Sequence, residues 1–115
     1  METICIDGSF TADTLEFYKK YGVSVPQQDK IYNFRDVINH ASKTAGGETV
    51  GVLLEEIINP NVPIYTPILG ETWREPTFSI KRFAKLDGSE ITKEEIKELS
   101  LQKVKIDEYK RTNSN

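Results

Sequence analysis

The chain has 115 residues, of which 37% are hydrophobic and 29% are charged, values near those of an ordinary globular protein. This length fits one domain that buries roughly two-thirds of its unfolded surface. The net charge of -3 argues against a partner held mainly by phosphate neutralisation. Cys5 is the single cysteine, which excludes an internal disulfide, and no apolar stretch approaches the ~20 residues of a membrane span.

The N-terminal residues predict a short strand and a cytoplasmic location. They lack the basic start and the long apolar segment of a secretory signal. Residues 3–7 alternate in a way that predicts a strand, with Ile4 and Ile6 facing the core and Cys5 on the opposite side.

A short helix is predicted to follow this strand. Thr11 can cap a helix over residues 12–21, and Gly22 can end it in the left-handed conformation. Leu15 and Tyr18 lie three residues apart on one face of it. We expect this helix to lie at the periphery of the domain.

The next β-rich run is residues 31–38. Tyr32, Phe34 and Ile38 share one parity, which predicts a strand with one buried face. Residues 40–48 are polar and predict a loop, so the strand and the one after it should form a hairpin with a long tip.

Residues 51–58 predict the central strand of the sheet. Other β-rich runs at residues 30–38 and 76–86 would lie on either side of it. An amphipathic helix is the alternative, because the i, i+1, i+4, i+5 spacing is also met by Leu53, Leu54, Ile57 and Ile58. A glycine pair before the run, its β-branched residues and the Asn-Pro stop after it favour the strand.

Residues 59–76 hold four of the five prolines, and we expect them to be irregular except for an extended piece near residues 64–65. A loop this long is often where function lies. Within residues 61–75, Trp73 either pins the loop to the domain or marks a contact surface. The candidate interaction residues are Trp73, Arg74 and Tyr65.

Residues 77–86 predict another strand. Its apolar parity shifts between Ile80 and Phe83, which a β-bulge near Lys81 or Arg82 would explain. The basic side chains of this run indicate the alternative function, which is binding of single-stranded nucleic acid. The candidate residues for that face are Lys81, Arg82 and Lys85.

The C-terminal part predicts a turn and a helix. Asp87 and Gly88 form the turn, and residues 92–95 fit a capping box that starts a helix with Ile96 and Leu99 on one stripe. We expect one domain over residues 1–109 and a disordered tail over residues 110–115.

Several blocks of the sequence together resemble a group of small uncharacterised proteins encoded by phages, prophages and other mobile elements. The blocks are Ile4–Asp7, Lys30–Val37, Gly51–Ile57, Phe78 and Arg82–Phe83. The resemblance implies a small SH3-like β-barrel. It implies no activity and no catalytic residue.

Residue types that carry chemistry are sparse. Divalent-cation binding would need convergent carboxylates, for which the candidates are Asp7, Asp36, Glu55 and Glu56, but salt bridges to Arg35 or Arg82 are favoured. His40 is the only histidine, and a lone histidine in a polar loop is usually exposed. Cys5 is expected to be a packed side chain rather than a nucleophile.

The sequence thus predicts a mainly β (α+β) domain, a small SH3-like barrel of about five strands with a peripheral N-terminal helix and a C-terminal helix. The predicted function is that of a non-catalytic accessory protein that uses no cofactor. Its partner would be another protein or a second copy of itself, with nucleic acid as the alternative and no membrane.

Overall fold

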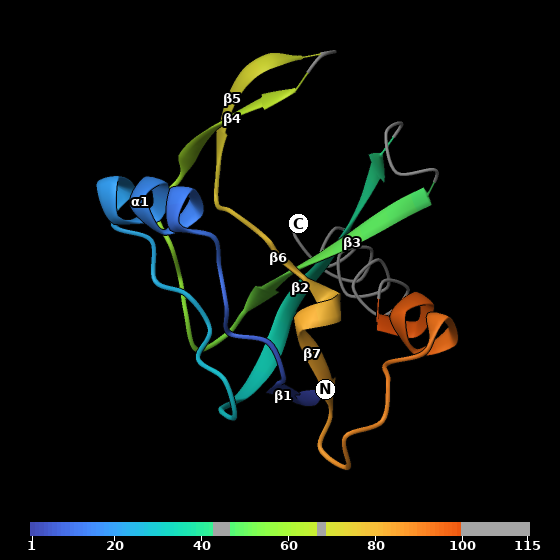
Figure 1. The fold of residues 1–115 in the computed structure, drawn as a ribbon. Coiled ribbons are helices and arrows are strands. Elements are labelled where there is room, and N and C mark those ends of the chain that lie inside the picture. The colour runs from blue at the N-terminus through green and yellow to red at the C-terminus, as the bar shows by residue number, and fades with distance from the viewer. Residues whose placement is uncertain (43–46, 67–68, 100–115) are drawn as a thin grey trace, which may run out of the picture.

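The computed structural model describes residues 1–42, 47–66 and 69–99 and has a mixed α+β fold, mostly sheet with two helices (Figure 1). One helix is α1 (Ala12–Tyr21), and the other spans residues 93–99 within the described part of the chain. A 3-10 turn, η1, covers Ile80–Arg82. The strands are β1 (Glu2–Cys5), β2 (Ile31–Ser42), β3 (Gly47–Leu54), β4 (Val62–Thr66), β5 (Gly70–Arg74), β6 (Phe78–Ser79) and β7 (Phe83–Lys85).

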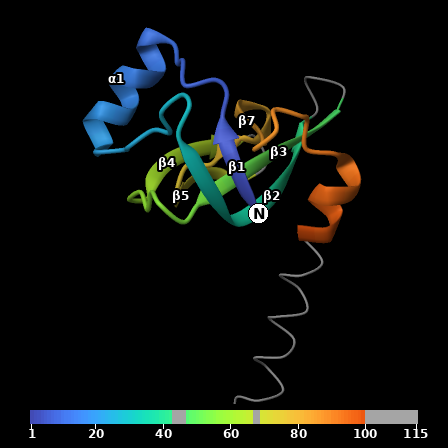
Figure 2. The same cartoon turned by 90° about the horizontal axis from the view of Figure 1, so that it is seen from below.

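Five strands form one antiparallel sheet in the order β6-β3-β2-β1-β7. β3 therefore lies between β2 and β6, so the two predicted neighbours of this strand are confirmed. The middle strand of the sheet is β2 and not β3, which corrects the prediction of a central strand at residues 51–58. Both views place α1 and residues 93–99 on opposite sides of this sheet (Figures 1 and 2). No ladder joins β6 to β7 among the described strands, so the sheet is open and the predicted closed barrel is not formed.

The short link between the two edge strands requires the sheet to curl. If the sheet were flat, four strand spacings of about 4.8 Å would separate β6 from β7 by roughly 19 Å. The link from Ser79 to Phe83 contains only η1 and spans about 14 Å at most even when extended. The edge strands must therefore be brought toward each other.

The predicted aromatic core is confirmed. Tyr32, Phe34, Phe78 and Phe83 are all buried, and the rings of Phe34 and Phe83 meet edge to face with centroids 5.4 Å apart. The two helices contribute half-buried side chains to the core, including Tyr18 and Ile96. The buried cluster is completed by Cys5, Val52, Leu54, Ile80 and Ile91.

The predicted orientation of β1 is wrong. Thr3 and Cys5 are buried, whereas Ile6 is 52% exposed and lies beyond the end of the strand. The Thr3 hydroxyl donates to the carbonyl of Tyr32 at 2.9 Å, so a polar residue occupies the core side without an unsatisfied group. Cys5 is packed, as predicted, but on the core side.

The β2–β3 hairpin is confirmed but is more regular than expected. Its ladder extends from Phe34–Leu54 to Ser42–Gly47, so the backbone of His40 belongs to β2 and not to a loop. A register shift between Phe34 and Asp36 reverses the parity, which explains why Val37 packs against the core.

The predicted strand over residues 51–58 is confirmed only as far as Leu54, where β3 ends. The backbone N–H of Glu55 still donates to the carbonyl of Asn33. Beyond it the chain turns away from the sheet, and Ile58 is exposed.

The proline-containing segment is not irregular, which corrects the prediction for residues 59–76. β4 and β5 form a two-stranded antiparallel sheet that projects beside α1 (Figure 1). Pro63 lies opposite Trp73 in this ladder. Because proline has no N–H, we infer that this is a non-hydrogen-bonded pair, a position at which proline is tolerated.

The C-terminal elements follow the prediction with one correction. The parity shift after Ile80 comes from η1 and not from a β-bulge. The turn at Gly88 and the capping box are confirmed, since the Thr92 hydroxyl donates to Glu95 Oε1 at 2.9 Å and accepts from the Glu95 N–H. Residues 100–115, which include the predicted tail, lie outside the described residues.

Candidate interaction surface

Helix α1 begins and ends as the sequence predicts. The Thr11 hydroxyl accepts from the Thr14 N–H, and Gly22 adopts φ 73° at the C-cap. Tyr18 is the half-buried contact to the core, with its ring 6.4 Å from that of Phe78. None of the ten helix residues is buried, so α1 presents Leu15 and Phe17 to solvent.

The β4–β5 hairpin has an exposed aromatic face. Side chains alternate between the two faces of a strand, and residues paired across a ladder share a face. Tyr65 is opposite Glu71, and Trp73 is two residues after Glu71, so Tyr65 and Trp73 lie on the same face. They are 77% and 59% exposed. Arg74 lies on the other face with Val62, so only two of the three predicted interaction residues come together.

Trp73 also contacts α1, which joins the two interpretations that the sequence left open. Its ring meets that of Tyr21 edge to face with centroids 6.1 Å apart, and Tyr21 in turn lies 5.0 Å from the ring of Phe17. This contact pins the hairpin to the helix, yet more than half of Trp73 is still exposed. We call Phe17, Tyr21, Tyr65 and Trp73 the aromatic surface.

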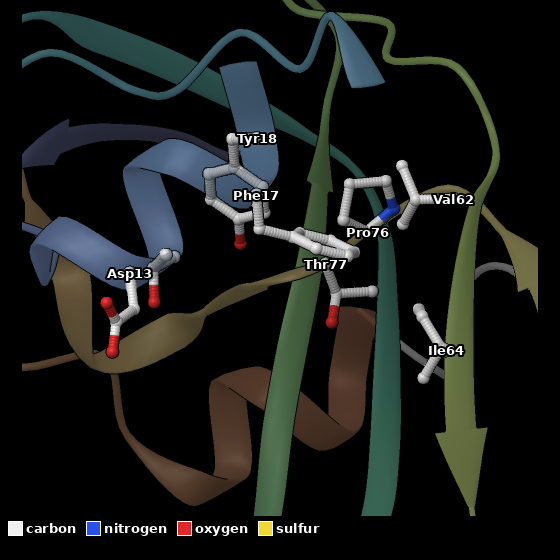
Figure 3. Close-up of a pocket in the computed structure, with 8 residues that line it drawn as sticks. Asp13, Phe17, Tyr18, Val62, Ile64, Pro76 and Thr77 are labelled. Atoms are coloured by element: carbon white, nitrogen blue, oxygen red, sulfur yellow. The ribbon is translucent and has the colours of Figure 1, made fainter. Parts of the chain in front are cut away.

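A groove of about 370 Å³ lies between α1 and β4 (Figure 3). Phe17 and Tyr18 line it from the helix, Ile64 lines it from the strand, and Pro76 lies between them. The remaining lining residues are Asp13, Thr14, Val62 and Thr77. The groove therefore joins the exposed side of α1 to the base of the hairpin and is mainly apolar.

A polar network around the buried Asn59 side chain holds the two ends of the hairpin. Asn59 is 8% exposed; its side chain accepts from the Ser24 N–H at 2.8 Å and donates to the Ser24 carbonyl at 2.9 Å. The Asn59 N–H donates to Glu75 Oε2 at 3.0 Å, and Arg35 forms a 2.6 Å ion pair with the same oxygen. The sequence indicated a stop at Asn59 but gave no signal for this network.

Two of the three predicted nucleic-acid residues already have partners within the chain. Arg82 lies 3.8 Å from the centre of the Phe10 ring and donates to the carbonyls of Asp7 and Ser9 at 3.1 and 2.6 Å. Lys85 pairs with Glu95 at 2.8 Å, and this hydrogen bond raises the pKa of Lys85. Lys81 is exposed.

The carboxylates considered for a cation site do not converge. Asp7 forms an ion pair with Arg82 at 3.6 Å, as predicted, whereas Glu56 accepts from Asn33 and Arg35 pairs with Glu75 instead. Within the described ranges, no group of three His, Cys, Asp or Glu side chains could hold a metal.

Of the two other candidate chemical groups, Cys5 gives no sign of a nucleophilic site. The Cys5 thiol is buried, and desolvation raises its pKa, which opposes formation of the thiolate. The His40 side chain lies outside the described residues.

Comparisons with known proteins identify no relative. No family model matches the chain, and no curated protein or solved structure matches it. In the part of the chain that the structure describes, no helix is long and apolar enough to cross a membrane.

Proposed function

We propose that this protein is a non-catalytic protein-interaction module and that its binding site is the aromatic surface. The observation that carries the proposal is the exposure of Trp73 and Tyr65 on one face of a projecting hairpin. Tryptophan and tyrosine supply much of the energy of protein interfaces, because they bury a large apolar area with few rotatable bonds. The proposal takes the partner to be a second copy of this chain.

The unpaired edge of β5 is the reason for taking the partner to be a second copy of the chain. The Pro63–Trp73 pair is non-hydrogen-bonded, so the backbone groups of Trp73, and those of Glu71 two residues earlier, point away from β4. None of the described strands pairs with that edge. Pro63 lacks a donor on the opposite edge of the hairpin, so β5 is the better template for another strand.

Pairing would also stabilise the hairpin itself. A two-stranded sheet alone is marginally stable in water, and three or more strands with an apolar face are needed for independent stability. Two β5 strands that meet across a two-fold axis would form a four-stranded sheet in which the same surface serves both copies. The Trp73 rings of the two copies would then lie beside each other on one face of that sheet and lose part of their exposure.

Trp73 gives a direct test because it is the only tryptophan in the chain. Its fluorescence is measured over a dilution series at constant salt. We expect the emission to shift to longer wavelength on dilution, as the interface opens and the ring becomes more hydrated. An unchanged emission maximum and unchanged acrylamide quenching over the series would exclude Trp73 from any self-association.

The strand order supports a further part of the proposal, an SH3-like arrangement. Strands β1, β2, β3 and β6 lie next to one another in that order across the sheet. After η1, β7 pairs with the other edge of β1. The curl that the η1 link requires brings the edges toward each other in the manner of a small barrel. A mobile-element origin belongs to the proposal on the sequence resemblance alone.

A further inference from the structure

A second cavity lies on the opposite side of the sheet from the aromatic surface. It has a volume of about 550 Å³ and is bounded by β6, η1, β7 and the helix at residues 93–99. Its apolar lining consists of Ile6, Val50, Ile80, Phe83, Ala84, Ile91 and Ile96. This volume and lining are those of sites for small apolar molecules.

Apart from Ser79, the polar side chains that line this cavity are charged. Lys81 and Lys93 line it from two different elements, and both are exposed. Neither lysine has an ion-pair partner among the residues that the structure describes, in contrast to Lys85 nearby. Glu90 also lines the cavity, so its lining carries a net charge of one positive unit.

We infer that this cavity binds an amphipathic anion, a molecule with an aliphatic body and a single carboxylate or sulfonate head. The aliphatic body would lie against Ile80, Phe83 and Ile91, where it would lose its contact with water. The head would stay at the exposed rim between Lys81 and Lys93. A neutral molecule of the same length would gain the apolar contact without the ionic one.

The experiment uses decanoate and decanol as probes on the full chain. Binding is followed by nuclear magnetic resonance of the isoleucine methyl groups, with Ile80 and Ile91 inside the cavity and Ile64 in the α1 groove as an internal reference. We expect decanoate to shift the first two resonances and not the third. Decanol should cause the same shifts at about tenfold higher concentration, because two exposed ion pairs together contribute about that factor.

Charge variants determine whether the lysines act as proposed. The double variant Lys81→Gln, Lys93→Gln should weaken decanoate binding about tenfold and leave decanol binding unchanged. Glu90→Gln should tighten decanoate binding, because it removes the one negative charge in the lining. The matched control, Lys19→Gln with Lys30→Gln, removes two exposed lysines that do not line this cavity.

Three results would overturn the inference: no shift of the Ile80 and Ile91 resonances, equal binding of decanol and decanoate, or a double variant that binds decanoate as well as the control does. These results are independent of the aromatic surface. If the cavity does not bind these anions, the proposed self-association is unaffected. If the protein does not self-associate, the inference about the cavity is likewise unaffected.

Discussion

Asn59 joins two distant segments of the chain through one buried side chain. It makes two hydrogen bonds with the backbone of Ser24, which lies 35 positions earlier in the sequence. Removal of the amide would leave the Ser24 N–H and carbonyl without these partners. Each of these two hydrogen bonds contributes about 0.5–1.5 kcal/mol to stability.

We therefore expect Asn59→Ala to lower the free energy of unfolding by about 1–3 kcal/mol in urea titrations. The matched control is Asn61→Ala, because Asn61 is exposed and should change stability by less than about 0.5 kcal/mol. Equal effects of the two variants would show that the Asn59–Ser24 contact does not hold the hairpin.

Cys5 predicts a dependence of stability on alkaline pH. Burial raises its pKa above the ordinary value of 9.0 in the folded state. As pH rises through 9.0, the unfolded chain loses the thiol proton first, so the free energy of unfolding decreases. The contribution of the Cys5 thiol to the free energy of unfolding is fully present below pH 9.0 and decreases above it.

The comparison that isolates this effect is wild type against Cys5→Ala, with the free energy of unfolding measured from pH 8 upward. The wild-type curve should fall more steeply than that of the variant once the pH passes 9.0. Parallel curves would contradict a raised pKa for the buried thiol.

Individual side chains were predicted with uneven success, for a physical reason. Tyr32 and Phe83 are large apolar residues whose burial dominates their placement, so the sequence was sufficient for them. Ile6 and Cys5 were placed on the wrong sides of the strand, because a hydroxyl bonded to the Tyr32 carbonyl makes burial of Thr3 acceptable. Such long-range hydrogen bonds leave no periodic signal in the sequence.

At the scale of elements, α1 was predicted in full because its signals are local. Thr11 and Gly22 fix its ends without help from the rest of the fold. The β4–β5 hairpin was missed because the prolines indicated irregular structure. Pro63 is compatible with a strand only because its missing N–H faces outward, which depends on how the strand pairs.

We expect Gly22→Ala to destabilise the protein by about 1 kcal/mol. A Cβ at this position meets nothing within 4 Å, so the cost arises from the left-handed backbone alone. Thermal unfolding followed by circular dichroism measures it. Glu16→Ala, an exposed change within the same helix, is the control, and a Gly22→Ala variant as stable as this control would refute the reasoning.

At the scale of the whole molecule, the sheet and its order are only partly accessible from sequence. The pairing of β3 with β2 could be predicted because consecutive strands usually pair. Its pairing with β6 was predicted from the β-rich run at residues 76–86, although β4 and β5 separate the two strands in the chain. The return of β7 to β1 depends on η1, which turns the chain between the two edges and resembles a bulge in the residue pattern.

Only part of the candidate site was predicted from the sequence: Phe17 and Tyr21 of the aromatic surface were missed, and the predicted Arg74 lies on the other face of the hairpin. Trp73 and Tyr65 were identified from their place between prolines. Their shared face, and the contact of Trp73 with Tyr21 on α1, depend on the register of the hairpin and on its position beside the helix. Neither of these follows from residue types alone.

Self-association through the aromatic surface is tested by the mass in solution, measured by light scattering over a range of concentrations for wild type and for the double variant Trp73→Ala, Tyr65→Ala. We predict a wild-type mass that approaches twice that of one chain as concentration rises, and a double variant that stays monomeric. Leu86→Ala removes an exposed apolar side chain outside the aromatic surface, and this variant should associate as wild type does. A wild-type protein that is monomeric at all concentrations, or a double variant that still dimerises, would show that the aromatic surface does not mediate self-association.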